Sequence, residues 1–455
     1  MTSKPRPVLG MVFLVVFIDL VGFSVIFPLF PQMIDHYMAI EGETSLFGRL
    51  IRWLEDLAGS STTAGFAVAT LFGGILGSLY SLLQFLFAPV WGAISDRYGR
   101  RPTLLVTLTG TLVSYALWMV AGNFAVLIAA RLLGGMMAGN ISTASAVVGD
   151  TTEGRDRAKG MGILGMAIGL GFILGPAIGG LASLWKMAPV GEAVGSFGLN
   201  PFSAAALAAV LLSAFNLLWV ALRFPETLPP EKRGRREHRP SLQPFKALRS
   251  IAVPGLTRTS WTYFTYFLAF SAMEFTLTFL AFERFSGPGD TDPWTERDNM
   301  WMFVFVGLLI ALVQGGVVRR LVPRMGEKKL ALAGLVLTLP GLLLVGLAGG
   351  VSTLYAGLAF MAVGSGLAMP TLSALVSRYA PSERQGLALG SFRSAGALSR
   401  AVGPILGGLL YWKLGSAAPY YAGTVFLLLP VLLAFGLPPV PDEPELAGRP
   451  AGDAA

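Results

Sequence analysis

The sequence predicts an all-α membrane protein with twelve transmembrane helices in two pseudo-symmetric six-helix bundles. Hydrophobic residues make up 54% of the chain and charged residues only 13%, which is too apolar for a soluble protein of 455 residues. The apolar runs are long and continuous rather than alternating, so helices are favoured over a β-barrel. One helical crossing takes about 20 apolar residues, so the chain has room for about a dozen. A glycine pattern that occurs once in each half indicates a duplication.

The predicted helices follow the limits of the apolar runs. They cover 8–34, 66–92, 102–121, 124–149, 158–183, 201–223, 258–282, 299–321, 329–348, 352–377, 386–411 and 419–437. The first run lacks a small-residue cleavage site, so we expect it to be retained as a helix rather than removed as a signal peptide.

Lys and Arg are concentrated on one side of this arrangement. Roughly 25 of the 34 fall in segments on the side of the amino terminus, which predicts that both termini are cytoplasmic. The expected organisation is a first bundle over 1–223, a basic, Pro-rich cytoplasmic linker over 224–257, a second bundle over 258–437 and a disordered tail over 438–455. Residues 46–57, in the long first outer loop, have the pattern of an amphipathic interfacial helix.

The duplication is visible in the fifth and eleventh predicted helices. Residues 160–186 contain Gly-Pro-Ala-Ile-Gly-Gly, residues 386–413 contain Gly-Pro-Ile-Leu-Gly-Gly, and Trp-Lys follows in both. Glycines at this spacing let helices pack backbone to backbone. Duplicated halves around a central site are the architecture of alternating access, which a channel does not need.

A charged turn joins the second and third predicted helices. Residues 88–102 read Ala-Pro-Val-Trp-Gly-Ala-Ile-Ser-Asp-Arg-Tyr-Gly-Arg-Arg-Pro. Charges avoid hydrocarbon, so the turn lies at a membrane surface, and its arginines mark the cytoplasmic side. Glycines there let the backbone turn sharply and let neighbouring chains approach. The residues that we assign to this motif are Gly92, Asp96, Arg97, Gly99, Arg100 and Arg101.

This turn resembles the cytoplasmic signature of major facilitator superfamily transporters. Three further stretches resemble motifs of the twelve-helix drug:proton antiporters: Asp19, Gly22 and Pro28 in the first helix; Arg131 and Gly135 in the fourth; and Gly171, Gly175, Pro176, Gly179 and Gly180 in the fifth. Together they resemble the tetracycline-exporter-like group. The residues at 71–86 and through 282–285 are similar to those of animal tetracycline-transporter-like proteins, which are linked with organic-anion transport.

The resemblance implies a role for the charged turn as a conformational latch. Asp96 is expected near the amino-terminal end of the eleventh helix, at about 386–390, where free N–H groups favour an anion. Arg100 is expected to reach Asp150 at the end of the fourth helix. Such contacts would hold the halves together when the site faces outward. The alternative is that these charges only set the topology.

Five ionisable side chains fall inside predicted spans: Asp19, Arg131, Glu274, Arg393 and Arg400. Each is costly in lipid, so we expect them to face a cavity and one another. Asp19 lies near mid-bilayer depth and is the candidate proton carrier, with Arg131 as a partner in one state. Glu274 is a second proton site or a counter-charge for Arg400. The structural alternative for Asp19 and Arg131 is a static buried ion pair.

Arg393 and Arg400 are seven residues apart on one face of the eleventh helix. Tetracycline exporters have small or neutral residues there, so the two arginines favour an anionic substrate over tetracycline. Neutralisation by Glu274 and Glu383 is the alternative. The remaining candidates for an amphipathic pocket are Phe23, Phe27, Gln84, Asn140, Tyr266, Phe270 and Met369, although aromatic and Met residues on such helices are more often packing.

The sequence therefore predicts a monomeric, proton-coupled exporter of amphipathic organic compounds, drugs or organic anions, with one substrate moved out for each proton moved in. The alternatives are uniport or symport of an organic anion, and a lipid or drug receptor that does not transport. An enzyme is disfavoured, because Cys is absent and the two histidines, His36 and His238, fall in predicted loops as solvated residues. No metal, cofactor or nucleic acid is expected. The composition favours a prokaryotic inner membrane.

Overall fold

The computed structural model describes residues 5–58, 64–152, 154–192, 195–233, 253–286, 293–380 and 385–439. In this part of the chain the secondary structure is helical, apart from an isolated bridge between Ala121 and Phe197. Much of the predicted linker, most of the tail, His238 and Glu383 lie outside the described residues.

The first half of the chain forms six membrane-crossing units. Its helices are α1 (Pro5–Ser24), η1 (Phe27–Leu29), α2 (Phe30–Glu41), α3 (Leu46–Ala58), α4 (Ala64–Tyr98), α5 (Arg100–Met119), α6 (Phe124–Met137), α7 (Asn140–Thr151), α8 (Gly154–Ala182) and α9 (Ser203–Arg223). A short turn, η2 (Pro230–Lys232), follows α9.

The second half repeats this plan. Its helices are α11 (Pro254–Phe285), α12 (Glu296–Leu312), the π-helical turn η3 (Val313–Val318), α13 (Arg319–Met325), α14 (Glu327–Gly346), α15 (Val351–Tyr379), α16 (Gln385–Leu414), α17 (Ala418–Phe426) and α18 (Leu428–Phe435). Eleven segments of the described chain are long and apolar enough to cross a membrane. α16 is the twelfth, since its 30 residues exceed a crossing although three basic side chains lower its apolar content. The prediction of twelve transmembrane helices is confirmed.

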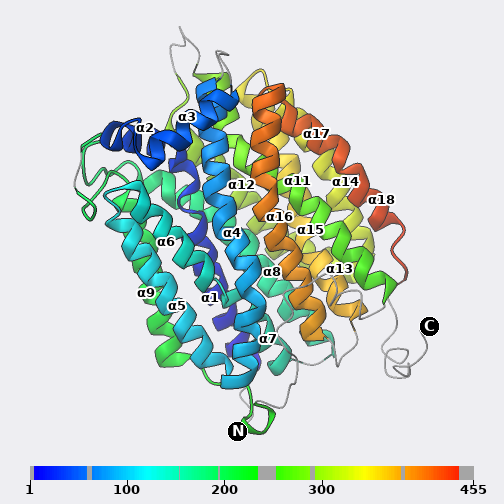
Figure 1. Ribbon diagram of the computed structural model, residues 1–455. Helices are drawn as coiled ribbons and strands as arrows, with labels where there is room; N and C mark the ends of the chain where they lie inside the picture. Colours follow the sequence, from blue (N-terminus) through cyan, green and yellow to red (C-terminus); the bar gives the residue numbers. More distant parts are fainter. Residues whose placement is uncertain are drawn as a thin grey trace.

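The two halves lie side by side, with their long helices running in roughly the same direction. Figure 1 shows the blue-to-green helices of the first half on one side and the green-to-red helices of the second half on the other. α4 packs along α16 and α8 packs along α12, and α15 also contacts α8, so several helices of each half form the contact between them. The turn from α4 to α5 lies at the lower end in Figure 1, and we call this the motif end.

Glycines bring equivalent helices together in both halves. A Cβ on Gly171 or Gly175 of α8 would lie 2.9 or 2.6 Å from a backbone oxygen of α1, and a Cβ on Gly179 would lie 2.0 Å from the carbonyl oxygen of Val25, directly after α1. In the second half, a Cβ on Gly403 or Gly407 of α16 would lie 3.0 or 2.5 Å from a backbone oxygen of α11. The fifth and eleventh crossings therefore occupy equivalent places, as the repeated pattern predicts.

Four crossings that the sequence predicts as single helices are interrupted, and the last of them is divided at Leu427 between α17 and α18. The first breaks after Ser24, and a proline lies in the first turn of both η1 and α2, where its missing N–H costs nothing. The fourth breaks at Ala138 and Gly139, between α6 and α7. The indole of Trp91 fills this break: its Nε1–H donates to the Met136 carbonyl at 2.7 Å, and a Cβ on Gly139 would lie 2.4 Å from the ring. The eighth crossing widens into η3.

The outer loop helix at 46–57 is confirmed as α3, but it is packed on protein. Its apolar side chains Phe47, Ile51 and Leu54 are each at most 2% exposed, and the Phe47 ring contacts the Phe124 ring at 4.7 Å. The apolar face thus covers the end of the first half that is opposite the motif end, which we call the outer end, whereas Trp53 on the other face is exposed.

The expectation of a solvated loop residue at position 36 is wrong. His36 lies in α2 and is fully buried against the rings of Tyr37 and Phe202. Its Nδ1 accepts a hydrogen bond from the Gly191 N–H at 3.0 Å. No local pattern indicates this contact, because 155 residues separate the two partners.

Candidate functional site

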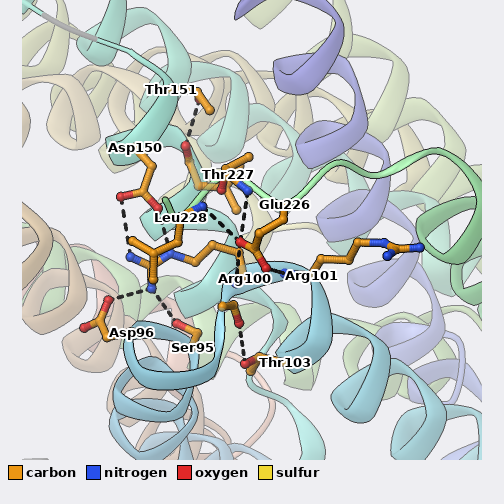
Figure 2. Close-up of polar contacts among 12 residues, drawn as sticks. Ser95, Asp96, Arg100, Arg101, Thr103, Asp150, Thr151, Glu226, Thr227 and Leu228 are labelled. Atoms are coloured by element: carbon orange, nitrogen blue, oxygen red, sulfur yellow. Dashed lines mark hydrogen bonds and ion pairs between the residues drawn. The ribbon is translucent and has the colours of Figure 1, made fainter. Parts of the chain in front are cut away.

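The charged turn at the motif end is built around Gly99 and Arg100. Gly99 has φ +110°, which side-chain-bearing residues rarely adopt, and it separates α4 from α5. Figure 2 shows the Arg100 guanidinium reaching back between Asp96 and Asp150. Its Nη1 lies 2.6 Å from Asp96 Oδ1 and its Nε 2.7 Å from Asp150 Oδ2, and the side chain is 1% exposed. The expected contact of Arg100 with Asp150 is present.

Arg100 also forms a hydrogen bond with a residue of α4, which fixes the direction of its guanidinium group. Its Nη1 donates to the Ser95 hydroxyl at 2.7 Å. A buried guanidinium is costly unless its donors are paired, and here two carboxylates and a hydroxyl pair them. The turn thereby joins the end of α7 to the end of α4 within the first half.

Glu226 completes the turn, and sequence reasoning missed it. Its carboxylate accepts the backbone N–H groups of Arg100 and Arg101, at 2.9 and 3.3 Å, which are the first two residues of α5. It also accepts the N–H groups of Thr227 and Leu228, both at 2.9 Å (Figure 2). A carboxylate at this helix start satisfies orphan donors and complements the helix dipole.

The other motif residues have distinct places. Arg101 Nη2 donates to the Ala221 carbonyl at 2.6 Å, and the exposed Arg97 lies over the Tyr98 ring at 5.3 Å. Gly92 was expected to help make the turn, but α4 continues through it as a helix, so that expectation is wrong. The proposed approach of Asp96 to the start of α16 involves side chains outside the described set, so it stays a prediction.

At mid-depth Asp19 bonds to an amide rather than to an arginine. It is the twelfth of the 22 residues in the apolar span Val8–Leu29 and is 4% exposed, buried in protein. Its Oδ1 accepts a hydrogen bond from Asn140 Nδ2 at 2.8 Å. Asn140 is the first residue of α7, so Asp19 also lies by the positive end of that helix. The expected pairing with Arg131 is absent from this conformation: no ion pair within 4 Å joins the two described side chains.

Arg131 is held by aromatic faces. Its guanidinium lies 4.9 Å from the Tyr80 ring centroid and 5.6 Å from that of Phe23. Its Nε and Nη2 have no hydrogen-bond partner, although the side chain is 3% exposed. Cation–π contacts balance part of the cost of burial and leave these donors available.

Arg400 lies where the two halves meet. Its Nη2 donates to Gln84 Oε1 of α4 at 2.9 Å, across the boundary between the halves. The guanidinium is packed between Phe172 of α8 and Phe267 of α11, 5.4 and 5.5 Å from the ring centroids. Arg400 is 7% exposed and its Nε has no partner. A single cation therefore contacts both halves through neutral groups.

The other two ionisable groups of the spans lie near Arg400. Arg393, one heptad earlier on α16, donates from Nη2 to the Ser373 hydroxyl at 3.1 Å and keeps an unpartnered Nε. Glu274 is partly exposed and its charge interacts with that of Arg400, but the two side chains are not within 4 Å. The expected neutralisation of Arg400 by Glu274 is thus not a direct ion pair.

The predicted pocket residues divide into two groups. Phe23, Phe27, Tyr266 and Phe270 belong to a row of aromatic rings that continues through Phe172 and Phe267, with neighbouring centroids 5.3 to 6.4 Å apart. Met369 is half-buried against the same core. Asn140 does not line a pocket, because both ends of its amide are used inside the first half. Phe172 and Phe267 were missed, since their sequence context does not distinguish them from packing residues.

The two halves contact each other on both sides of the level of Arg400 and the aromatic row. Toward the outer end the rings of Phe30 and Phe275 are 5.9 Å apart, and a Cβ on Gly74 of α4 would lie 3.1 Å from the Pro404 carbonyl. Toward the motif end, a Cβ on Gly165 of α8 would lie 3.8 Å from Pro370 of α15. Arg400 and the aromatic row therefore lie between two zones of contact, which is where a central transport site is built.

Comparisons with known proteins agree with this geometry. The chain is 34% identical to human Major facilitator superfamily domain-containing protein 10 over 94% of this chain and 92% of that protein. It is 30% identical to the class C Tetracycline resistance protein of Escherichia coli over 74% and 79% of the two chains. The crystal structure of the human organic anion transporter MFSD10 (TETRAN) superimposes with a TM-score of 0.78 at 32% identity, covering 95% of this chain and all of that one.

These relatives are membrane transporters, and those that are 32–34% identical over 94–95% of this chain are animal proteins, so they give no support to the expected prokaryotic inner membrane. They are not enzymes, in agreement with the sequence. The model of the Major Facilitator Superfamily matches residues 12–324 and 294–454, and the chain belongs to that family of multi-pass membrane transporters.

Proposed function

We propose that this transporter exchanges an amphipathic organic anion for protons by alternating access. The observation that carries the proposal is Arg400, a buried cation in contact with both halves, whose partners are an amide and two aromatic faces rather than a carboxylate. Such a cation keeps its charge for a ligand. The rings of Phe172 and Phe267 supply apolar contact for the rest of an amphipathic molecule.

The relatives support the class of substrate. The human relative of known structure is an organic anion transporter. Arg393 adds a second cation one heptad away, so a carboxylate or sulfonate would meet two guanidinium groups on one helix face. We therefore favour an organic anion over tetracycline.

Asp19 is the proposed proton carrier. It is a buried acid at mid-depth whose hydrogen-bond partner is neutral, so a proton can be added without breaking an ion pair. Glu274 is a second candidate on the other half, and Arg131 is the cation that would meet Asp19 in another conformation. The motif end, with its cluster of arginines, is proposed to face the cytoplasm, together with both termini.

The turn around Arg100 is the proposed latch, which holds the two halves together when the site faces outward, with Asp96 directed to the start of α16. Its ion pairs hold α4, α5 and α7 as one unit, which allows the first half to move rigidly against α16. Rigid rocking of one half against the other is how duplicated transporters expose a fixed site to each side in turn.

Flux in proteoliposomes tests the coupling. We expect an outward-directed organic anion flux that accelerates when the proton gradient is directed inward, and a proton influx that accompanies it. Anion flux that ignores the gradient would establish uniport, and flux driven by a proton gradient of the opposite sense would establish symport. Ligand binding without flux would establish a receptor.

Two substitutions assign the roles. Asp19→Asn is expected to keep binding and lose proton-driven flux, whereas Asp35→Asn, at an exposed acid of α2, keeps it; full proton-driven flux in Asp19→Asn would remove Asp19 from the mechanism. Arg400→Gln is expected to weaken anion binding by about 10- to 100-fold, the value of one charge-assisted hydrogen bond, and to leave cationic amphiphiles less affected. Arg258→Gln, at an exposed arginine of α11, is the control. Equal losses for anions and cations would make Arg400 structural.

A further inference from the structure

The partner of Asp19 is itself held by a second side chain. Asn140 is fully buried, and while its Nδ2 donates to Asp19, its Oδ1 accepts a hydrogen bond from the Thr107 hydroxyl of α5 at 2.5 Å. The amide is therefore fixed from both ends. The Thr107 hydroxyl as donor and the Asp19 carboxylate as acceptor together set the orientation of the amide.

Thr107 belongs to a column of buried hydroxyls on one face of α5. Thr103 donates to the Gly99 carbonyl at 2.8 Å, and Thr111 donates to the Thr107 carbonyl at 3.0 Å. All three threonines are at most 2% exposed. The column begins at Gly99, so it runs from the turn that holds Arg100 to the level of Asp19.

Thr107 has more acceptors than it can use at once. Its oxygen lies 3.0 Å from the Thr103 carbonyl, 3.2 Å from the Leu104 carbonyl and 2.5 Å from Asn140 Oδ1. A hydroxyl carries one hydrogen and two lone pairs, so only one of these three can accept from it. The hydrogen can thus leave Asn140 for a backbone carbonyl that is already within reach.

We infer that Asn140 and Thr107 form a two-position relay that reports the protonation of Asp19 to α5. This inference rests on the proposed role of Asp19 as proton carrier. With Asp19 charged, Nδ2 of Asn140 donates to the carboxylate and Thr107 donates to Oδ1, as observed. Asn140 and Thr107 are positioning residues, because they act through Asp19 and do not touch cargo.

Protonation of Asp19 reverses each hydrogen bond in the chain. The new Asp19 O–H needs an acceptor, and rotation of the Asn140 amide by half a turn presents Oδ1 to it. The amide Nδ2–H then points at the Thr107 oxygen, which accepts it and gives its own hydrogen to the Thr103 carbonyl. The Asp19 carboxyl group, both ends of the Asn140 amide and the Thr107 hydroxyl each keep a hydrogen-bond partner in both arrangements, so the proton changes the direction of the chain without breaking it.

Other charges near Asp19 do not titrate in the relevant range. The titratable side chains that its charge reaches are Tyr80 of α4 and Tyr115 of α5, and the charge of Arg131 of α6 acts on the same two phenols. Phenol and guanidinium groups keep one protonation state between about pH 5 and 8. Glu274, on the other half, has its own carboxyl band in the infrared spectrum, so its titration is distinguished from that of Asp19.

The experiment follows the C=O stretch of the protonated carboxyl group by infrared difference spectroscopy of the full chain in liposomes. The Asp19 band is identified by its loss in Asp19→Asn. Thr107→Val removes the hydroxyl at constant shape, and Thr107→Ser keeps it. Thr111→Val is the matched control, since Thr111 is equally buried but bonds only to backbone.

Loss of the Thr107 hydroxyl weakens Asn140 as a donor to the charged carboxylate. We expect the titration midpoint of the Asp19 band in Thr107→Val to move upward by about half to one pH unit, the value of one hydrogen bond. Thr107→Ser and Thr111→Val keep the midpoint of the unmodified protein. In an Asn140→Ala background, Thr107→Val is expected to add no further shift.

Two outcomes overturn the relay. One is a Thr107→Val midpoint equal to that of Thr111→Val. The other is that Thr107→Val moves the midpoint in the Asn140→Ala background by as much as it does in the unmodified protein. If the Thr107→Val variant does not reach the membrane, the midpoint of the Asp19 band is measured in Thr107→Ala, which also lacks the hydroxyl. Full proton-driven flux in Asp19→Asn would instead overturn the proposed function, and the band midpoints would still decide the relay.

Discussion

Glu226 gives a prediction whose size can be worked out from the structure. Replacing it by alanine removes the acceptor for two N–H groups that open α5 and for two more in its own turn. Loss of a helix cap costs about 0.5–2 kcal/mol, and loss of a negative charge at a helix start about 0.3–1 kcal/mol. We expect about 2 kcal/mol in total for the first turn of α5. Gly99 confirms how closely the carboxylate fits, since a Cβ there would lie 2.3 Å from Glu226 Oε2.

Hydrogen exchange measures this cost locally. A loss of 2 kcal/mol corresponds to about 30-fold faster exchange of the amides of Arg100 and Arg101, since 1.4 kcal/mol is tenfold. Mass spectrometry of a peptide that spans the start of α5 reports these amides. Glu231→Ala, at an exposed acid of η2, is the control and is expected to leave exchange unchanged. Equal exchange in the Glu226 and Glu231 variants would refute the assignment of Glu226 as the cap.

Two further predictions concern packing and pH. Gly175→Ala is expected to lower the stability of the folded protein by about 1–3 kcal/mol, because its Cβ meets the Val21 carbonyl at 2.6 Å; Gly77→Ala, with open space at its Cβ, is the matched control in thermal unfolding, and equal melting temperatures would contradict the helix contact. Burial lowers the pKa of His36 below its ordinary 6.5, so the neutral form contributes stability above that pH, which is lost as the pH falls toward the folded-state pKa. Melting temperatures between pH 7 and 5 are expected to fall less in His36→Asn, which keeps an acceptor for Gly191; parallel curves would exclude His36.

The order of helices could be predicted, because it depends on signals that are local in sequence. Apolar runs indicated the crossings, and the spacing of Gly171, Gly175 and Gly179 indicated a close backbone contact on this face of the fifth helix. The structure identifies the partner helix as α1. The contact between Arg100 and Asp150 followed from the resemblance, with both residues at helix ends. The position of a crossing and its glycine face are set by residue type and position along one helix, whereas a contact between two helices, such as that of Arg100 with Asp150, was predicted only from the resemblance.

The missed features depend on what a side chain meets after folding. Glu226 follows α9 by a few residues, and nothing in its spacing shows that its carboxylate returns to the start of α5. One signal was present: Gly99-Arg100-Arg101-Pro102 offers no side chain that could cap the helix, so its N–H groups needed an acceptor from elsewhere. His36 was misplaced because a histidine between apolar runs is ordinarily solvated.

The central charges differ most from the expectation, and the difference bears on cargo. Ion pairs were expected among the five ionisable residues of the spans, yet Asp19 bonds to an amide, Arg131 to aromatic faces, and Arg400 to an amide and aromatic faces. An ion pair would cancel charge and resist separation, whereas these neutral partners leave each charge in place. Three arginines and two acids then give the middle of the protein a net charge of +1 when all are ionised, and +2 or more once an acid takes up a proton. Within one conformation, proton uptake therefore strengthens the central field for an anion, and a positive linkage of this sense belongs to symport. Exchange requires instead that the acid takes up its proton in the conformation that has already released the anion, so the direction of the proton gradient that drives anion flux decides between the two.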